Sequence, residues 1–110
     1  THLPQARYPA GAEMQALARG RLTIENGCIR LGAGPESNLI VWPSSAKLER
    51  EGDRILIRDQ ISGNVVAIGD TVEMGGGQSS ELDEAYLTGG VPASCAGPYW
   101  IAGTGWRVAP

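Results

Sequence analysis

The chain has no phenylalanine, one histidine and two cysteines among its 110 residues. The histidine, His2, lies in an N-terminal stretch that we expect to be a tail, so it gives a serine or cysteine nucleophile no positioned base. Also absent are a Cys-x-x-Cys pair, a G-x-x-x-x-G-K-S/T phosphate loop and the D-x-D/N-x-D/N-G calcium pattern. We therefore expect no cofactor and no metal site; the alternative is a calcium site that uses Asp53, Asp59 or Asp70 with loop carbonyls.

Positive charge and long apolar segments are scarce as well. Nine Lys and Arg residues stand against twelve Asp and Glu, for a formal net charge of −3, and the basic residues are scattered along the sequence. Nucleic acids require basic residues gathered on one face, so we expect no nucleic-acid partner. No apolar run approaches the roughly 18 residues of a membrane-spanning helix. The chain starts at Thr1 rather than Met, as removal of a signal peptide or lipoprotein leader would leave it. We expect a link to a membrane only through such a leader or its lipid anchor.

Glycine, by contrast, is abundant, with 16 residues, which is typical of many turns between short strands. The clearest turn is Asn26-Gly27 in LTIENGCIRL, residues 22–31. A two-residue type I′ turn there predicts a hairpin with a fixed register. The facing pairs would be Leu22 with Leu31, Thr23 with Arg30, Ile24 with Ile29, and Glu25 with Cys28. The four aliphatic residues then share one face, and Cys28 falls on the polar face.

A cysteine on the polar side of a hairpin indicates a bonded partner rather than core filling. The only other cysteine is Cys95. Three interpretations are open: a disulfide, two unrelated buried thiols, or a redox pair. The sequence favours the disulfide, which would favour a periplasmic, cell-envelope or secreted location.

Further strands are expected along the rest of the chain. Residues 37–43 form an apolar run ended by Pro43, typical of a strand that is buried on both faces or closes a barrel. Ile55 and Ile57 alternate with Arg54, Leu56 and Arg58, which predicts a strand with those two residues facing inward. A second hairpin is predicted around Gly69-Asp70, with the glycines at 75–77 ending its second strand. In this hairpin one face would carry Val65, Ala67, Val72 and Met74.

The C-terminal third is expected to add one helix and two short strands. SSELDEAYL, residues 79–87, begins with a serine cap and an acidic first turn, which predicts a helix. Residues 97–108 predict two short strands around Gly103-Thr104-Gly105, or one strand kinked there. We expect a tail or short helix over 1–19 and a single β domain over 20–110. The predicted fold is an all-β, OB-like small barrel of six to eight short strands with one short helix; the alternative is a β-sandwich.

The strings GRLTIENGCIRL, LIVWP, GDTVEMGGG and CAGPYW, spanning roughly residues 20–102, resemble a module of uncharacterised bacterial exported or lipoprotein-anchored proteins. The resemblance implies a paired Cys28 and Cys95 and an envelope or secreted location. It brings no known reaction.

The candidate functional residues are carboxylates and aromatic rings. Asp53, Asp59, Asp70 and Glu73 are available for paired-acid catalysis, but each lies in or beside a predicted turn, where such residues serve the backbone. Tyr99, Trp100 and Trp106 lie near predicted strand ends, where exposed rings bind carbohydrate or peptide. With phenylalanine absent, these rings and Trp42 could equally fill the core.

Three functions follow from these residues. The first is a noncatalytic binding or interaction module of the bacterial envelope or secreted space, with a protein or carbohydrate ligand. The second is a small hydrolase that uses paired acids such as Asp53 and Asp70. The third is an OB-type binder of oligonucleotides or oligosaccharides.

Overall fold

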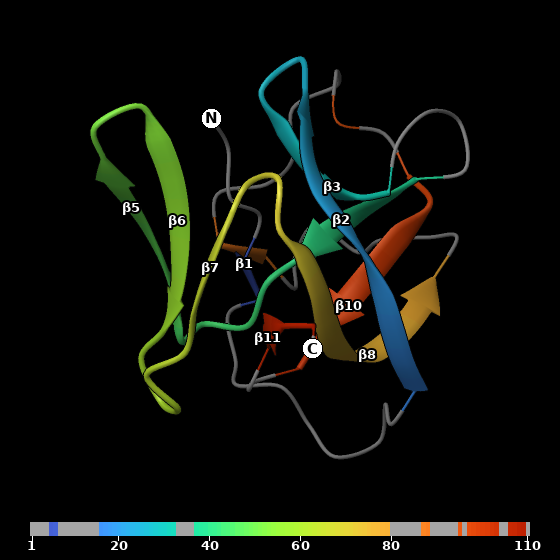
Figure 1. Ribbon diagram of the computed structural model, residues 1–110. Coiled ribbons are helices and arrows are strands. Elements are labelled where there is room, and N and C mark those ends of the chain that lie inside the picture. The colour runs from blue at the N-terminus through green and yellow to red at the C-terminus, as the bar shows by residue number, and fades with distance from the viewer. Residues whose placement is uncertain are drawn as a thin grey trace.

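The computed structural model describes residues 5–6, 16–32, 37–79, 87–88, 95, 97–103 and 106–109. Within these ranges all regular structure is β, and Figure 1 shows how the strands are arranged. The strands are β1 (Gln5–Ala6), β2 (Ala16–Glu25), β3 (Cys28–Leu31), β4 (Asn38–Val41), β5 (Ala46–Glu51), β6 (Arg54–Asp59), β7 (Val65–Ala67), β8 (Thr71–Ser79), β9 (Leu87–Thr88), β10 (Tyr99–Ala102) and β11 (Arg107–Val108).

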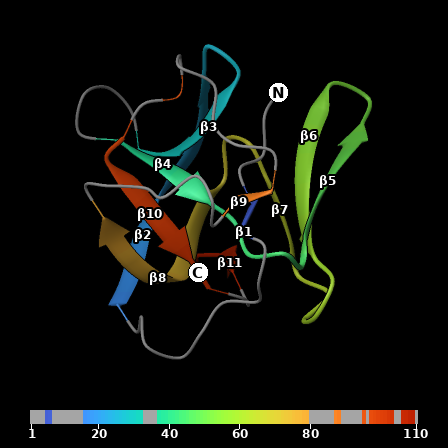
Figure 2. The same cartoon turned by 180° about the vertical axis from the view of Figure 1, so that it is seen from behind.

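Five of these strands close into a ring. The order is β10-β4-β3-β2-β8, and a further pairing of β10 with β8 completes the circle, while β11 adds to the free side of β8. Strand β10 runs parallel to β4 and antiparallel to β8, and Figure 2 shows β10 beside β4. Numbered along the ring strands alone, the order is 1-2-3-5-4. This is the closure of a five-stranded Greek-key barrel, and it confirms the predicted OB-like fold.

The hairpin of β2 and β3 has the predicted register at all four pairs, from Leu22 with Leu31 to Glu25 with Cys28. Asn26 and Gly27 have φ values of 54° and 78°, as a type I′ turn requires. Strand β2 is long enough to serve two neighbours: its second half pairs with β3, and its first half, residues 16–21, pairs with β8. Because β2 begins at Ala16, the sheet starts before residue 20.

The triple glycine does not end a strand, contrary to the prediction. Residues 75–77 lie inside β8 and contact both β2 and β10: Gly76 faces Ala16 on one side and Ala102 on the other. A Cβ atom on Gly76 would overlap the carbonyl oxygen of Ile101, and the φ of Gly76 is +142°. Glycine is thus required there because the backbones approach too closely for a side chain.

A second sheet of order β5-β6-β7 stands beside the barrel (Figure 1). The predicted pairing of residues 65–67 with the strand after Gly69-Asp70 is wrong, because β7 pairs with β6. The turn between β7 and β8 is hydrogen-bonded to β2 instead. Gly69 N donates to Leu22 O at 2.8 Å, and Leu22 N donates to Asp70 O at 2.9 Å. On β7, Val66 belongs to the hydrophobic core and Ala67 is also buried, while Val65 is half-buried.

One hydrophobic core joins the barrel to this second sheet. The rings of Trp42 and Trp106 meet edge to face at 5.0 Å between centroids, and Trp106 Nε1 donates to Ile57 O at 3.4 Å. This core consists of Leu22, Ile29, Leu31, Ile40, Trp42, Ala46, Ile57, Val66, Val72, Met74, Trp100, Ala102 and Trp106. The expected inward position of Ile57 is thereby confirmed.

The helix predicted over residues 79–87 falls mostly outside the described residues. Its two end residues are in strands, with Ser79 closing β8 and Leu87 opening β9. Strand β9 pairs with β1, and Gln5 bridges to Trp42 beside β4. The C-terminal stretch forms two short strands, as one of the two expectations had it. Among the described residues no helix could cross a membrane.

Candidate functional site on the outer faces of the barrel

A disulfide joins the first hairpin to the segment before β10. Cys28 and Cys95 are bonded at 2.00 Å with a Cα separation of 5.6 Å. The predicted pairing is therefore confirmed. Cys28 lies on the side of the hairpin opposite the barrel core, as the register requires, but that side is not exposed: Cys28 is 1% and Cys95 3% accessible. Both sulfurs pack with Leu39 and Tyr99 in a small second cluster.

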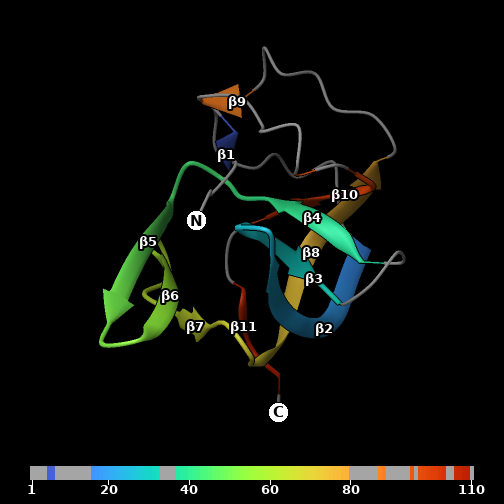
Figure 3. The same cartoon turned by 90° about the horizontal axis from the view of Figure 1, so that it is seen from above.

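The outer side of β3 and β4 is covered throughout. Leu39 and Val41 face away from the barrel core and are nevertheless fully buried. Arg30 is 9% exposed on the same side, and it donates from Nε to Ser37 Oγ at 2.6 Å and from Nη2 to Ser37 O at 2.9 Å. Figure 3 shows β1 and β9 on this side of β4. We call this surface the covered face: Cys28, Arg30, Leu39, Val41 and Tyr99.

The opposite outer surface, on β2, β8 and β11, is open to solvent. Arg19 on β2 faces Glu73 on β8, and Glu73 in turn faces Arg107 on β11. The Glu73 carboxylate accepts from Arg107, with Nε and Nη2 each 3.3 Å from Oε1. Arg21 and Leu17 lie in the neighbouring rows, and Leu17 is 67% exposed. We call this surface the open face: Leu17, Arg19, Arg21, Thr71, Glu73, Gly75, Gly77 and Arg107.

The aromatic residues proposed as a ligand site are mainly core residues. Trp106 is fully buried and Trp100 is 7% exposed. Tyr99 is half-buried and packs against the disulfide cluster. The three rings thus form no common exposed patch, and packing accounts for them, as the alternative in the sequence suggested. A ligand role for them stays a prediction.

The candidate carboxylates are spread over separate turns and strands. Asp59 is fully buried and holds the turn after β6: its Oδ1 accepts from Ile61 N at 3.0 Å and its Oδ2 from Ser62 Oγ at 2.8 Å. Asp70 accepts from Ala67 N at 2.9 Å, while Asp53 lies exposed in the turn between β5 and β6. Glu73 pairs with Arg107 on the open face. Each carboxylate with a described contact thus serves local structure.

Within the described part of the chain, no three His, Cys, Asp or Glu residues gather closely enough to hold a metal ion. No family model, curated protein or solved structure matches this chain. The resemblance to exported bacterial modules stays a prediction.

Proposed function

We propose that this chain is a noncatalytic binding or interaction module of the bacterial cell envelope or secreted space. The observation that carries the proposal is the buried Cys28–Cys95 disulfide. Structural disulfides persist in oxidising compartments and are rare in the cytosol. The contacts of Asp59, Asp70 and Glu73 support a noncatalytic role, because each of these acids is engaged in holding a turn or a strand pair.

An OB-type oligosaccharide binder is a more specific form of this proposal. The strand order of the ring favours it, since barrels of that order bind oligomers on an outer face. Fold alone does not assign function, so the ligand has to be argued from the surface.

The compartment is tested on the protein recovered from fractions of its own cells. Alkylation is carried out before and after reduction under denaturing conditions and is read by mass spectrometry. We expect the protein in the envelope or culture-fluid fraction, with no alkyl group added before reduction and two added after it. Two alkylated thiols before reduction, in the cytosolic fraction, would refute the proposal.

The noncatalytic role is tested with the double variant Asp53→Asn, Asp70→Asn. Wild type and variant are incubated with purified cell-wall polysaccharide, and the release of reducing ends is measured. We expect no release by either protein. Release by the wild type that the variant lacks would instead establish the carboxylate hydrolase.

A further inference from the structure

The three-stranded sheet beside the barrel ends in an open edge. Its order is β5-β6-β7, and no described strand pairs with the far side of β5. In Figures 1 and 2, β5 lies at the outer margin of the molecule. The edge of a sheet presents backbone N–H and C=O groups that can pair with another extended chain. This edge is therefore a surface on which a further strand can dock.

The register between β5 and β6 determines which backbone groups reach the open edge. Gln60 N donates to Ser45 O at 3.0 Å, in continuation of the β5–β6 register. In an antiparallel ladder, hydrogen-bonded pairs alternate with pairs whose backbone groups point away from each other. Every second residue of β5 after Ser45 is therefore bonded to β6. Leu48 and Arg50 lie between these residues, so their N–H and C=O groups point to the open edge.

The remaining outward-pointing residue of β5 is already bonded within the chain. Ala46 N donates to Pro43 O at 3.1 Å, and Ala46 O accepts from Gln5 Nε2 at 2.7 Å. In the part of the chain that the structure describes, the outward groups of Leu48 and Arg50 have no such partner. The edge thus offers two residues, spaced two positions apart, to an incoming strand.

A second copy of β5 matches that spacing. When two such strands pair antiparallel about a two-fold axis at Glu49, Leu48 of each copy faces Arg50 of the other. Each facing pair then forms both N–H···O=C bonds of a hydrogen-bonded pair. An axis at Leu48 would instead set Arg50 against Ala46, whose N–H is bonded to Pro43 O, and would leave Arg50 O without a donor. The backbone groups therefore favour the axis at Glu49.

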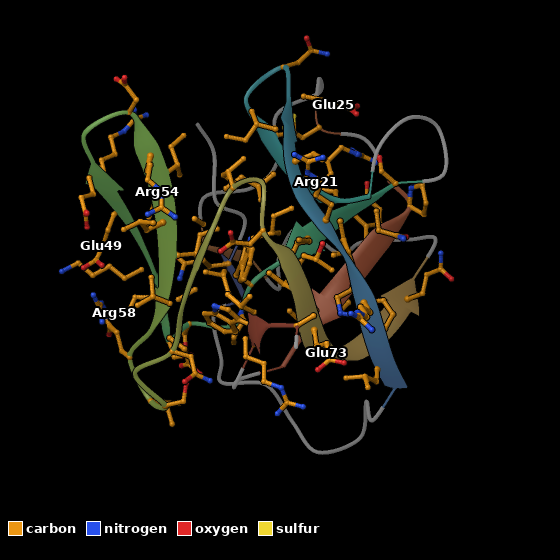
Figure 4. The ribbon with its side chains drawn as sticks, viewed as in Figure 1. Arg21, Glu25, Glu49, Arg54, Arg58 and Glu73 are labelled. Carbon is orange, nitrogen blue, oxygen red and sulfur yellow. A yellow bond between two sulfur atoms is a disulfide. The ribbon has the colours of Figure 1, made fainter. Side chains whose placement is uncertain are left out.

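The same register brings opposite charges together. Lys47 of each copy faces Glu51 of the other, and both side chains are exposed and have no ion-pair partner among the described residues. Within its own sheet Lys47 lies opposite Arg58, a like charge, so an acid on its other side relieves a repulsion. The two Glu49 side chains meet at the axis, where each carboxylate is paired with Arg58 of its own chain at 3.0 Å; Figure 4 labels both residues.

The charges also distinguish a second copy from an unrelated peptide. Any extended peptide can bond to the free backbone groups, but it matches Lys47 and Glu51 only if its own charges have the opposite order. A second copy that runs antiparallel has that order, and the two-fold arrangement uses both open edges, so it closes at a dimer.

We propose that two copies of this chain associate through β5 and form one continuous sheet of order β7-β6-β5-β5-β6-β7 across the two molecules. This association goes beyond the proposed function and does not depend on it.

The charge pairs are tested by sedimentation equilibrium of the oxidised protein. We expect the wild type to show a monomer–dimer equilibrium with a dissociation constant between about 1 μM and 1 mM, as small, transient interfaces have. Lys47→Glu and Glu51→Lys each set like charges opposite each other, so each variant alone should associate at least about tenfold more weakly. An equimolar mixture of the two variants restores opposite charges in both pairs and should form a mixed dimer with an affinity close to that of the wild type.

The backbone pairing is tested at Arg50, which is exposed. Arg50→Pro removes an outward N–H that the fold of a single copy does not use. The matched control, Arg50→Ala, removes the same side chain and keeps the N–H. We expect the proline variant to associate at least about tenfold more weakly than the wild type, and the alanine variant to stay within about threefold of it. Urea unfolding establishes that each variant is folded, and the charge variants decide the question if Arg50→Pro is not.

Several results would overturn the proposal. A wild type that stays monomeric at about 1 mM would exclude a second copy as the occupant and leave the edge to an extended strand of another protein. A dimer that Lys47→Glu and Arg50→Pro do not weaken would exclude β5 as the interface. Charge variants that stay monomeric when mixed would contradict the pairing of Lys47 with Glu51, and equal weakening by Arg50→Pro and Arg50→Ala would contradict the backbone pairing.

Discussion

The Cys28–Cys95 bridge gives the sharpest stability prediction, because its effect follows from chain length. The two residues are 67 positions apart. In the chain-entropy model, cross-linking a loop of that length removes enough freedom from the unfolded chain to stabilise the fold by about 4 kcal/mol. Small domains have a net stability of about 5–15 kcal/mol, so the bridge supplies a large share. We therefore expect that opening it leaves a fold close to its limit of stability.

The assay is equilibrium urea unfolding, followed by tryptophan fluorescence, of the wild type with and without a strong reductant. Comparing oxidised and reduced forms of one sequence keeps every side chain the same. At a slope of about 2 kcal/mol per molar urea, a loss of 4 kcal/mol lowers the midpoint by about 2 M. The double variant Cys28→Ala, Cys95→Ala should unfold at a midpoint near that of the reduced wild type.

The reduced protein should also show a steeper slope, because its unfolded chain is less compact. An unchanged midpoint after verified reduction would refute the reasoning. It would mean that the burial of Leu39 and Tyr99 around the sulfurs holds the C-terminal segment without the bond.

Two further substitutions, each with a control substitution, test the barrel and its loops by urea unfolding. Gly76→Ala should lower the free energy of unfolding by about 3 kcal/mol or prevent folding, because its Cβ would overlap Ile101 O at a φ of +142°. The control is Gly103→Ala, whose Cβ would lie 3.7 Å from Gly75 O, and its free energy of unfolding should stay within about 1 kcal/mol of the wild type. Similar losses for both would contradict the role given to Gly76. Asp59→Ala should lower the free energy of unfolding by about 1–3 kcal/mol, because it leaves Ile61 N without its acceptor. Asp53 is exposed, so the control Asp53→Ala should change the free energy of unfolding by less than about 0.5 kcal/mol. Equal effects at the two aspartates would refute the turn-holding role.

The parts of the fold that local chemistry decides could be predicted from the sequence. Asn26-Gly27 determined the register of the first hairpin, because few turns other than type I′ suit that dipeptide between alternating strands. The apolar run before Pro43 was similarly informative: β4 is covered on both sides and also helps to close the ring.

The parts decided by distant neighbours could not be predicted. Gly75 to Gly77 were interpreted as a strand end, since nothing nearby in the sequence reveals that β10 approaches their backbone. Adjacent glycines after an alternating strand are also a signal of close backbone approach, and that interpretation would have been correct. Gly69-Asp70 suggested a hairpin, but hydrogen bonds to Leu22 direct the chain from one sheet to the other.

In the candidate site, too, the features decided locally could be predicted and those decided by distant neighbours could not. The cysteine pairing could be predicted, because only two cysteines exist. The burial of Cys28 could not, because it depends on Leu39, Cys95 and Tyr99 from other parts of the chain. Arg107 of the open face is far in sequence from Arg19 and Arg21, and it becomes their neighbour only through β8.

The position of β8 in the ring has a consequence for synthesis of the chain. A ribosome releases the β2–β3 hairpin and the β5-β6-β7 sheet early, but the first half of β2 has no partner until β8 emerges, about fifty residues later. Closure then waits for Ala102 at the end of β10. A nascent chain stopped before that point holds the β5-β6-β7 sheet and an open β4-β3-β2-β8 sheet whose apolar side is unprotected. The barrel therefore closes only after the last third of the protein has been synthesised. C-terminal truncation should abolish the barrel altogether rather than shorten it.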